Sequence, residues 1–154
     1  MSRTDQPFSV AYSLSRLLPA DPCAVFAAWT TATGLAAWLG PEEYDVPSGR
    51  AVMDARAGGT WGLVMVAPDG SESRLGGKVR EVDHPRRLVL TTGDPANTAG
   101  DTASVVTLQL VSAGDGTSMH FHQAGVNTSS EHAEQARQGW LHFFDRLERH
   151  LRST

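Results

Sequence analysis

The sequence contains a single cysteine and no long hydrophobic run. Cys23 alone cannot form an intrachain disulfide, and cysteine-based zinc motifs need more than one thiolate. A membrane-spanning helix needs about 18 consecutive apolar residues, and no such stretch occurs. The N-terminal residues also lack the apolar segment of a signal peptide. We therefore expect a cytoplasmic protein that does not insert into membranes.

Basic charge is scarce as well. The chain has 13 Lys and Arg against 17 Asp and Glu, and its formal net charge is −4. The basic residues are scattered, whereas binding to a phosphate backbone needs a clustered basic surface, so we expect no nucleic-acid partner. The motifs of serine hydrolases, zinc proteases and nucleotide-binding proteins do not occur, and Gly58-Gly59 is typical of a tight turn.

The C-terminal segment, residues 128–152, predicts one long amphipathic helix. Thr128 is suited to the N-cap, and Glu131 completes a capping box. Apolar residues recur at steps of three and four, which places them on one face. That face consists of Ala133, Ala136, Trp140, Phe143, Phe144, Leu147 and Leu151. It needs a broad apolar partner, and Gly139 is expected to let another backbone approach closely.

The rest of the chain predicts short strands and two short helices. Alternation of apolar and small polar residues over 8–15 indicates a first strand, and Asp21-Pro22 is a helix start. A second helix is expected over 34–39. Further strands are expected over 44–46, 51–56, 61–65, 75–82, 88–92, 106–111 and 117–123, with a bulge at Gly76-Gly77 and a loop over 93–101.

Short turns between consecutive strands favour an antiparallel meander. The order strand, two helices, strands, long helix then indicates an α+β helix-grip fold, in which a curved antiparallel sheet wraps around the C-terminal helix. Such a fold leaves a cavity between helix and sheet. We expect a single domain over residues 8–152, preceded by a disordered tail at 1–7.

Several segments, in order along the chain, also resemble a known family. They are residues 16–20, 25–30, 35–41, 57–61, 68–70, 85–88, 116–117 and 139–140. Together they are similar to proteins related to the activator of heat-shock-protein-90 ATPase, in the START-like (SRPBCC) superfamily, which also holds polyketide cyclases and lipid-transfer domains. Members often have two tryptophans where this chain has Trp38-Leu39. The resemblance implies the helix-grip fold and does not imply one function.

Aromatic and sulfur side chains at inward positions are the strongest candidates for a ligand site. Trp offers an N–H, Met adapts to irregular shapes, and Gln123 can present an amide at the cavity mouth or mark the end of its strand. Ordinary core packing is the competing interpretation. The candidates are Trp29, Trp38, Met53, Trp61, Leu63, Met65, Met119, Phe121, Gln123, Trp140 and Phe144.

Three functions follow from this pattern. The first is binding of a small hydrophobic or aromatic molecule in the cavity. The second is an enzyme of cyclase or dehydratase type, for which Asp54, Arg56 and Glu81 are the polar candidates on strands. The third is a chaperone-interacting protein without a ligand. An open apolar cavity favours the first, a buried acid or base the second, and a filled interior the third.

The remaining candidate groups predict no metal or cofactor site and no catalytic residue. His120 and His122 share a strand face, but Met119 and Phe121 should point inward and turn both histidines outward. Cys23 has no flanking base and is expected to be a small buried residue. The sequence leaves open whether the protein is a homodimer.

Overall fold

The structure, a computed structural model, describes residues 9–40, 43–47, 49–92, 104–127 and 130–153. The expected tail at 1–7, the loop over 93–101 and the cap at Thr128 lie outside these ranges. The elements are β1 (Ser9–Leu18), α1 (Pro22–Thr30), α2 (Ala32–Trp38), β2 (Ala51–Met53), β3 (Thr60–Val66), β4 (Glu72–Asp83), β5 (Arg87–Thr92), β6 (Ser104–Ala113), β7 (Gly116–Asn127) and α3 (Ser130–Arg152). Their order is the predicted one.

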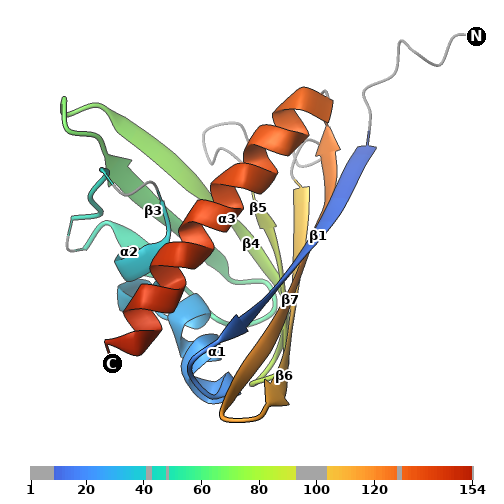
Figure 1. The fold of residues 1–154 in the computed structure, drawn as a ribbon. Coiled ribbons are helices and arrows are strands. Elements are labelled where there is room, and N and C mark those ends of the chain that lie inside the picture. Colours follow the sequence, from blue (N-terminus) through green and yellow to red (C-terminus); the bar gives the residue numbers. More distant parts are fainter. Residues whose placement is uncertain (1–8, 41–42, 48, 93–103, 128–129, 154) are drawn as a thin grey trace, which may run out of the picture.

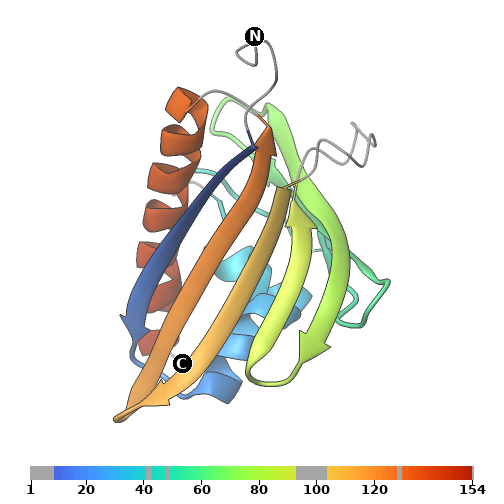
Figure 2. The ribbon, with the colours of Figure 1, turned by 90° about the vertical axis from the view of Figure 1, so that its right-hand side faces the viewer.

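The strands form one seven-stranded sheet in the order β1-β7-β6-β5-β4-β3-β2, and each neighbouring pair is antiparallel. Figure 1 shows α3 lying across the inner side of the curved sheet, with α1 and α2 near its C-terminal end. Figure 2 shows the outer side, where β1, β7, β6, β5 and β4 face the viewer and the helices lie behind or beside them. The α+β helix-grip prediction is confirmed.

The two short helices begin where their caps place them. Asp21 Oδ1 accepts a hydrogen bond from the backbone N–H of Ala24 at 2.8 Å, as expected of an N-cap followed by proline. Helix α2 begins earlier than predicted, because Thr31 Oγ1 accepts from the N–H of Gly34 at 3.0 Å. The predicted range 34–39 missed this cap.

Two of the predicted strands are shorter than expected. The segment predicted as a strand over 44–46 makes only an isolated bridge, between Asp45 and Val66. Strand β2 ends at Met53 because the chain turns directly after it, with Gly58 at a positive φ of 89°. A tight turn at Gly58-Gly59 was predicted, so only the strand boundary was wrong.

The bulge expected at Gly76-Gly77 is also in a different place. Gly76 pairs in register with Gly62, and the register of β4 shifts only between Val79 and Glu81. Gly77 has another reason to lack a side chain: a Cβ there would lie 2.1 Å from the carbonyl oxygen of Thr91. Strand β5 comes so close at this point that only glycine fits.

The core lies between the inner face of the sheet and the apolar face of α3. Trp140, Phe144 and Leu147 are buried there, as the helix pattern predicts. For Gly139, in contrast, no described residue beyond its chain neighbours and its own helix backbone lies within 4 Å of where a Cβ would be, so the expected close approach of a backbone was wrong. Position 139 lies one residue from the buried stripe, about 100° away around a helix.

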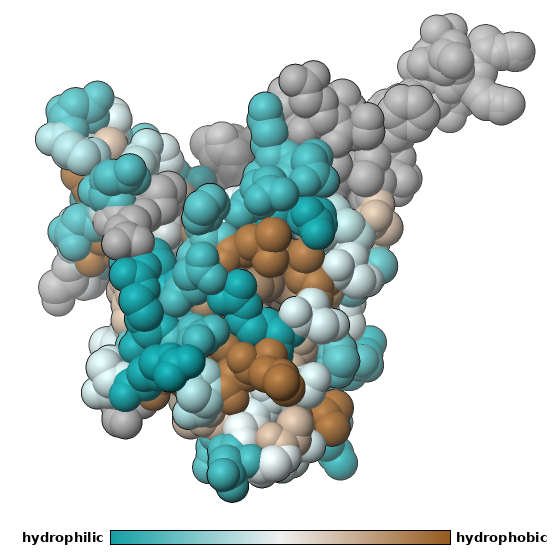
Figure 3. Space-filling model, in the orientation of Figure 1, coloured by the Kyte–Doolittle hydropathy of each residue, from teal (hydrophilic) through white to brown (hydrophobic). Residues whose placement is uncertain are grey.

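Hydrophilic residues cover much of the surface seen in Figure 3, and hydrophobic atoms appear there in separate patches. Along the edge of the fold, Arg16 of β1 binds Asp145 of α3 at 2.7 Å and joins strand to helix. None of the helices in the described parts of the chain is long and apolar enough to cross a membrane.

Candidate functional site

Five aromatic rings pack together between α3 and the sheet. We call this group the ring cluster; it consists of Trp29, Trp38, Phe121, Trp140 and Phe144. The ring centroids are 4.7 Å apart for Phe121 and Trp140, 4.8 Å for Trp29 and Trp38, and 5.3 Å for Phe121 and Phe144. At such distances the rings are in contact. Side chains from α1, α2, β7 and α3 therefore fill this part of the space where a cavity was expected.

The two tryptophans of the short helices differ in their hydrogen bonding. Trp38 Nε1 donates to the carbonyl oxygen of Ala28 at 2.9 Å. Trp29 is only 2% exposed, and its Nε1 has no acceptor among the described residues. An indole nitrogen can only donate, so this N–H is a buried group whose hydrogen-bonding capacity is unused.

Four other predicted lining residues lie on β2 and β3, at the edge of the sheet opposite β1. Trp61, Leu63 and Met65 are buried on β3, and Met53 on β2 is partly buried against the same core. Trp61 Nε1 donates to the carbonyl oxygen of Thr91 at 2.8 Å. Among the described residues, no ring contact joins Trp61 to the ring cluster. Met119, on β7, is fully buried in the core.

A buried polar network lies beside the ring cluster and is centred on Gln123. Its Oε1 accepts hydrogen bonds from the hydroxyl of Tyr12 and from Trp140 Nε1, the latter at 3.1 Å. Its Nε2 donates to Ser104 Oγ at 2.7 Å and to Thr92 Oγ1 at 3.2 Å. The sequence placed this amide either at the cavity mouth or at the end of its strand. In the structure it has partners on four different elements, and β7 continues past it to Asn127.

Tyr12 remains a neutral hydroxyl in this network. Burial raises its pKa to about 12; nearby Arg137 lowers it and Glu134 raises it by smaller amounts. At neutral pH the phenol therefore keeps its proton and donates a hydrogen bond to Gln123 Oε1. The network is polar but carries no charge.

Sequence reasoning identified Gln123 and missed its polar partners on β5 and β6. The signal was present in the alternation of each strand. Thr92 continues the inward parity of Leu88 and Leu90, and Ser104 precedes Val106 by two positions on β6. Extending the period of two past the last apolar residue would have placed both hydroxyls inside.

The polar residues weighed as acid or base lie on the surface instead. Asp54 pairs with Arg56 at 2.8 Å, and Glu81 pairs with Arg87 at 2.9 Å. The buried polar side chains of the described residues are Thr91, Thr92, Ser104, Thr117 and Gln123. The buried side chains of the described residues therefore include neither a carboxylate nor an imidazole that could act as general acid or base.

The histidines of β7 point outward, as predicted. His122 Nδ1 lies 2.9 Å from Ser13 Oγ, and His120 Nδ1 lies 3.1 Å from Ser15 Oγ, all on the exposed face. Within the described ranges, no group of three or more His, Cys, Asp or Glu side chains could hold a metal ion. Cys23 is exposed, which corrects the expectation of burial: helix α1 buries positions 25, 26, 28 and 29, and position 23 is on its other side.

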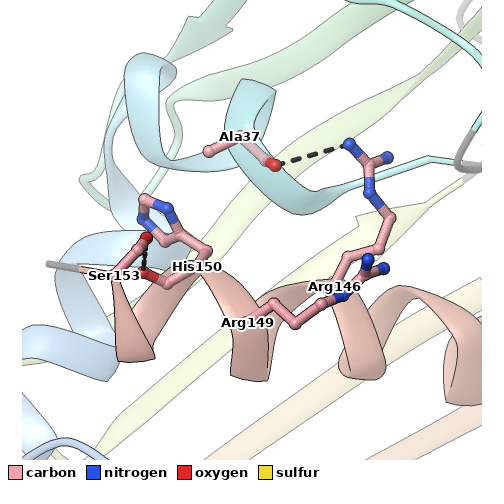
Figure 4. A pocket seen from close by; sticks show the side chains of 5 residues that line it. All are labelled: Ala37, Arg146, Arg149, His150 and Ser153. Carbon is pink, nitrogen blue, oxygen red and sulfur yellow. Dashed lines mark hydrogen bonds between the residues drawn. The ribbon is translucent and has the colours of Figure 1, made fainter.

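A surface groove separates α2 from the C-terminal end of α3 (Figure 4). It is lined by Ala37, Arg146, Arg149, His150 and Ser153. Arg146 donates to the carbonyl oxygens of Gly40, at 2.8 Å, and Ala37, at 3.5 Å. This arginine satisfies carbonyl groups at the end of α2 and so fixes the short helix against α3.

Known proteins share both the sequence pattern and the fold. The family profile described as "Activator of Hsp90 ATPase homolog 1-like protein" matches residues 19–152. The crystal structure of the AHSA1 protein from Silicibacter pomeroyi is 25% identical, with a TM-score of 0.79 over 92% of this chain and 97% of that one. The solution structure of an AHSA1-like protein from Aeromonas hydrophila is 22% identical, with a TM-score of 0.77 over 94% and 93%.

A third solved structure, a protein of unknown function from Staphylococcus aureus, is 18% identical with a TM-score of 0.79 over 96% of both chains. No curated protein matches the sequence. The structural likenesses under 25% identity bear on the fold alone, whereas the profile covers most of the chain. The chain therefore belongs to the Activator of Hsp90 ATPase homolog 1-like family, within the START-like superfamily.

Proposed function

We propose that this protein binds a small, mainly apolar or aromatic molecule between α3 and the sheet. The observation that carries the proposal is the Gln123 network inside a core made mainly of apolar side chains. Burying polar groups costs free energy, and a core that needed only stability would be served by apolar side chains. An amide, a phenol and two hydroxyls next to aromatic rings are instead the usual composition of a ligand site, with an apolar wall and a few polar groups.

The ligand's apolar part would lie among the rings, and its polar group near Gln123 and Tyr12. Because the rings are in contact, binding requires them to separate, by rotamer changes or by a small shift of α3. Affinity would come from apolar burial at about 25 cal/mol per Å². The network favours an uncharged polar group, because it is neutral and the nearby charges of Arg137 and Glu134 already pair with each other at 3.2 Å.

The test is a titration of apolar, aromatic and lipid-like compounds, followed by tryptophan fluorescence at two salt concentrations. Trp29 and Trp140 lie within the ring cluster, so separation of the rings should change the emission. We expect saturable binding that varies little with salt. Gln123→Leu should weaken the binding of compounds that carry a polar group. The control Gln109→Leu, at an exposed position, should leave the affinity of these compounds unchanged. If no compound binds, the proposal is wrong.

A second candidate is a contact with a chaperone that needs no ligand. Two observations favour it: the ring cluster fills its part of the interior, and the family description refers to activation of the Hsp90 ATPase. It predicts that an Hsp90-type chaperone hydrolyses ATP faster when this protein is added, with all small molecules failing to bind. A rate unchanged by excess protein would remove this candidate.

A further inference from the structure

We propose that the indole N–H of Trp29 donates a hydrogen bond to the ligand, and that the ligand is a neutral cyclic or aromatic molecule carrying a carbonyl oxygen. This inference rests on the proposed function and specifies the chemistry of the same site. It is carried by the contrast between Trp29 and the other tryptophans of the chain.

The sequence has four tryptophans, and three of them have acceptors within the protein. Trp38 donates to the carbonyl oxygen of Ala28 at 2.9 Å, Trp61 to that of Thr91 at 2.8 Å, and Trp140 to Gln123 Oε1 at 3.1 Å. Trp29 is equally buried, yet its N–H has no acceptor in the described part of the chain. A buried donor without an acceptor is rare in folded proteins, because the group loses its hydrogen bonds to water and gains none.

The ring of Trp29 also lies in the place where a ligand among the rings would contact it. Its ring centroid lies 4.8 Å from that of Trp38, 6.2 Å from that of Trp140 and 6.4 Å from that of Phe121. Trp140 in turn connects the ring cluster to Gln123. A molecule that separates these rings therefore contacts the indole of Trp29 and lies next to the polar network.

The chemistry of the donor and its surroundings narrows the ligand class. An N–H matches an acceptor oxygen, and a carbonyl is a much stronger acceptor than the face of a ring. A carboxylate would be a stronger acceptor still. However, no cationic side chain is among the buried residues described here, and Arg137 near Tyr12 already pairs with Glu134, so a buried anion would lack a counter-charge of its own. A ketone, ester or amide oxygen fits both conditions.

The experiment compares 1-indanone with indane, two bicyclic probes that share a carbon skeleton and differ in the carbonyl group. Dissociation constants are measured calorimetrically for the wild type, for Trp29→Phe and for the control Trp38→Phe. Removing a ring changes the space for both probes, so the informative quantity is the ratio of the indane constant to the indanone constant. We expect this ratio to fall about five- to tenfold in Trp29→Phe and to stay unchanged in Trp38→Phe.

A second measurement on the wild type keeps the inference testable if Trp29→Phe does not fold. The indole N–H signals are followed by ¹H–¹⁵N correlation spectra while each probe is added. Indanone should move the Trp29 indole proton downfield, as a hydrogen bond to a carbonyl does. Indane should not produce this shift.

The outcomes distinguish a failure of the carbonyl inference from a failure of the proposed ligand binding. If both probes bind but the ratio is the same in wild type and Trp29→Phe, or the Trp29 proton responds alike to both, the carbonyl inference is overturned and ligand binding stands. If neither probe binds at millimolar concentration, and no other compound of the panel binds, the proposed function fails and the inference fails with it. A ratio that falls equally in both variants also overturns the role of Trp29.

Discussion

Strand β7 has two faces built from alternate residues, and they differ in what their polar groups contact. On the inner face, Gln123 follows Met119 and Phe121, is buried, and has hydrogen-bond partners on four elements. On the outer face, His120 and His122 are exposed and form hydrogen bonds with serine hydroxyls of β1 and β7. Both faces carry polar side chains, so polarity alone does not distinguish them.

The difference lies in what replaces a lost contact. On the outer face water takes over when a side chain is removed, and the cost is small. On the inner face the former partners stay buried, and no water replaces the lost hydrogen bond. Each unsatisfied group then costs its full desolvation free energy. The inner face should therefore dominate stability and binding, and three substitutions test this expectation.

The largest effect is expected for Trp140→Ala. The ring of Trp140 contacts those of Trp29, Phe121, Phe143 and Phe144, and its Nε1 donates to Gln123. Its removal therefore leaves a cavity in the ring cluster and takes one donor away from Gln123 Oε1. We expect a loss of about 3–5 kcal/mol in the free energy of unfolding, measured by urea titration. The control His142→Ala, at an exposed position of the same helix, should cost under about 0.5 kcal/mol. A loss at position 140 below about 1 kcal/mol would mean that the ring cluster contributes little to stability.

An intermediate effect is expected for Gln123→Leu. This change keeps the size of the side chain but leaves the hydroxyl of Tyr12 and the N–H of Trp140 without their acceptor. We expect a loss of about 2 kcal/mol. Gln109→Leu, at an exposed position on the outer face of β6, is the matched control and should change stability by less than about 0.5 kcal/mol. Equal effects of the two substitutions would remove the distinction between the faces.

The smallest effect depends on pH and concerns Tyr12. Its pKa is about 12 in the folded protein, against 10.0 ordinarily. Well below pH 10 the phenol is protonated in both the folded and the unfolded state. As the pH rises toward 12, Tyr12 loses its proton in the unfolded chain but keeps it in the folded chain, so the free energy of unfolding falls. Tyr12→Phe lacks this contribution, and the stability gap between wild type and variant should narrow between pH 9 and pH 11.5, by less than about 1.4 kcal/mol per pH unit. A gap as wide at pH 11.5 as at pH 9 would contradict a protonated, buried phenol.

The sequence predicted the fold better than the site because periodicity reports which face a residue is on and not what it touches. Alternation placed Phe121 and Gln123 inside and the histidines outside, and steps of three and four placed Trp140 on the inner face of α3. It could not pair Tyr12 with Gln123, since that contact joins strands at opposite ends of the chain. The unused N–H of Trp29 is likewise invisible in a sequence, because it depends on where every nearby carbonyl lies.

The errors have local causes as well. Cys23 was expected to be buried because small apolar-like residues usually are, but its position on α1 places it outside. A bulge was expected at Gly76-Gly77 because glycine pairs often mark one, whereas Gly77 is required by the nearness of Thr91. Residue type gives the average behaviour, and the neighbouring strand or helix face decides the particular case.

The pairing of β1 with β7 has a consequence for how the chain folds. Tyr12 and Gln123 are 111 positions apart, and the sheet is incomplete until β7 reaches β1. During synthesis β1 leaves the ribosome before β7, its neighbour in the sheet, so both edges of β1 stay unpaired until β7 has emerged. Contacts of such long sequence separation slow folding, and the exposed strand is open to wrong pairing in the meantime. The polar network would therefore be among the last parts of the molecule to form, and its presence would report that folding is complete.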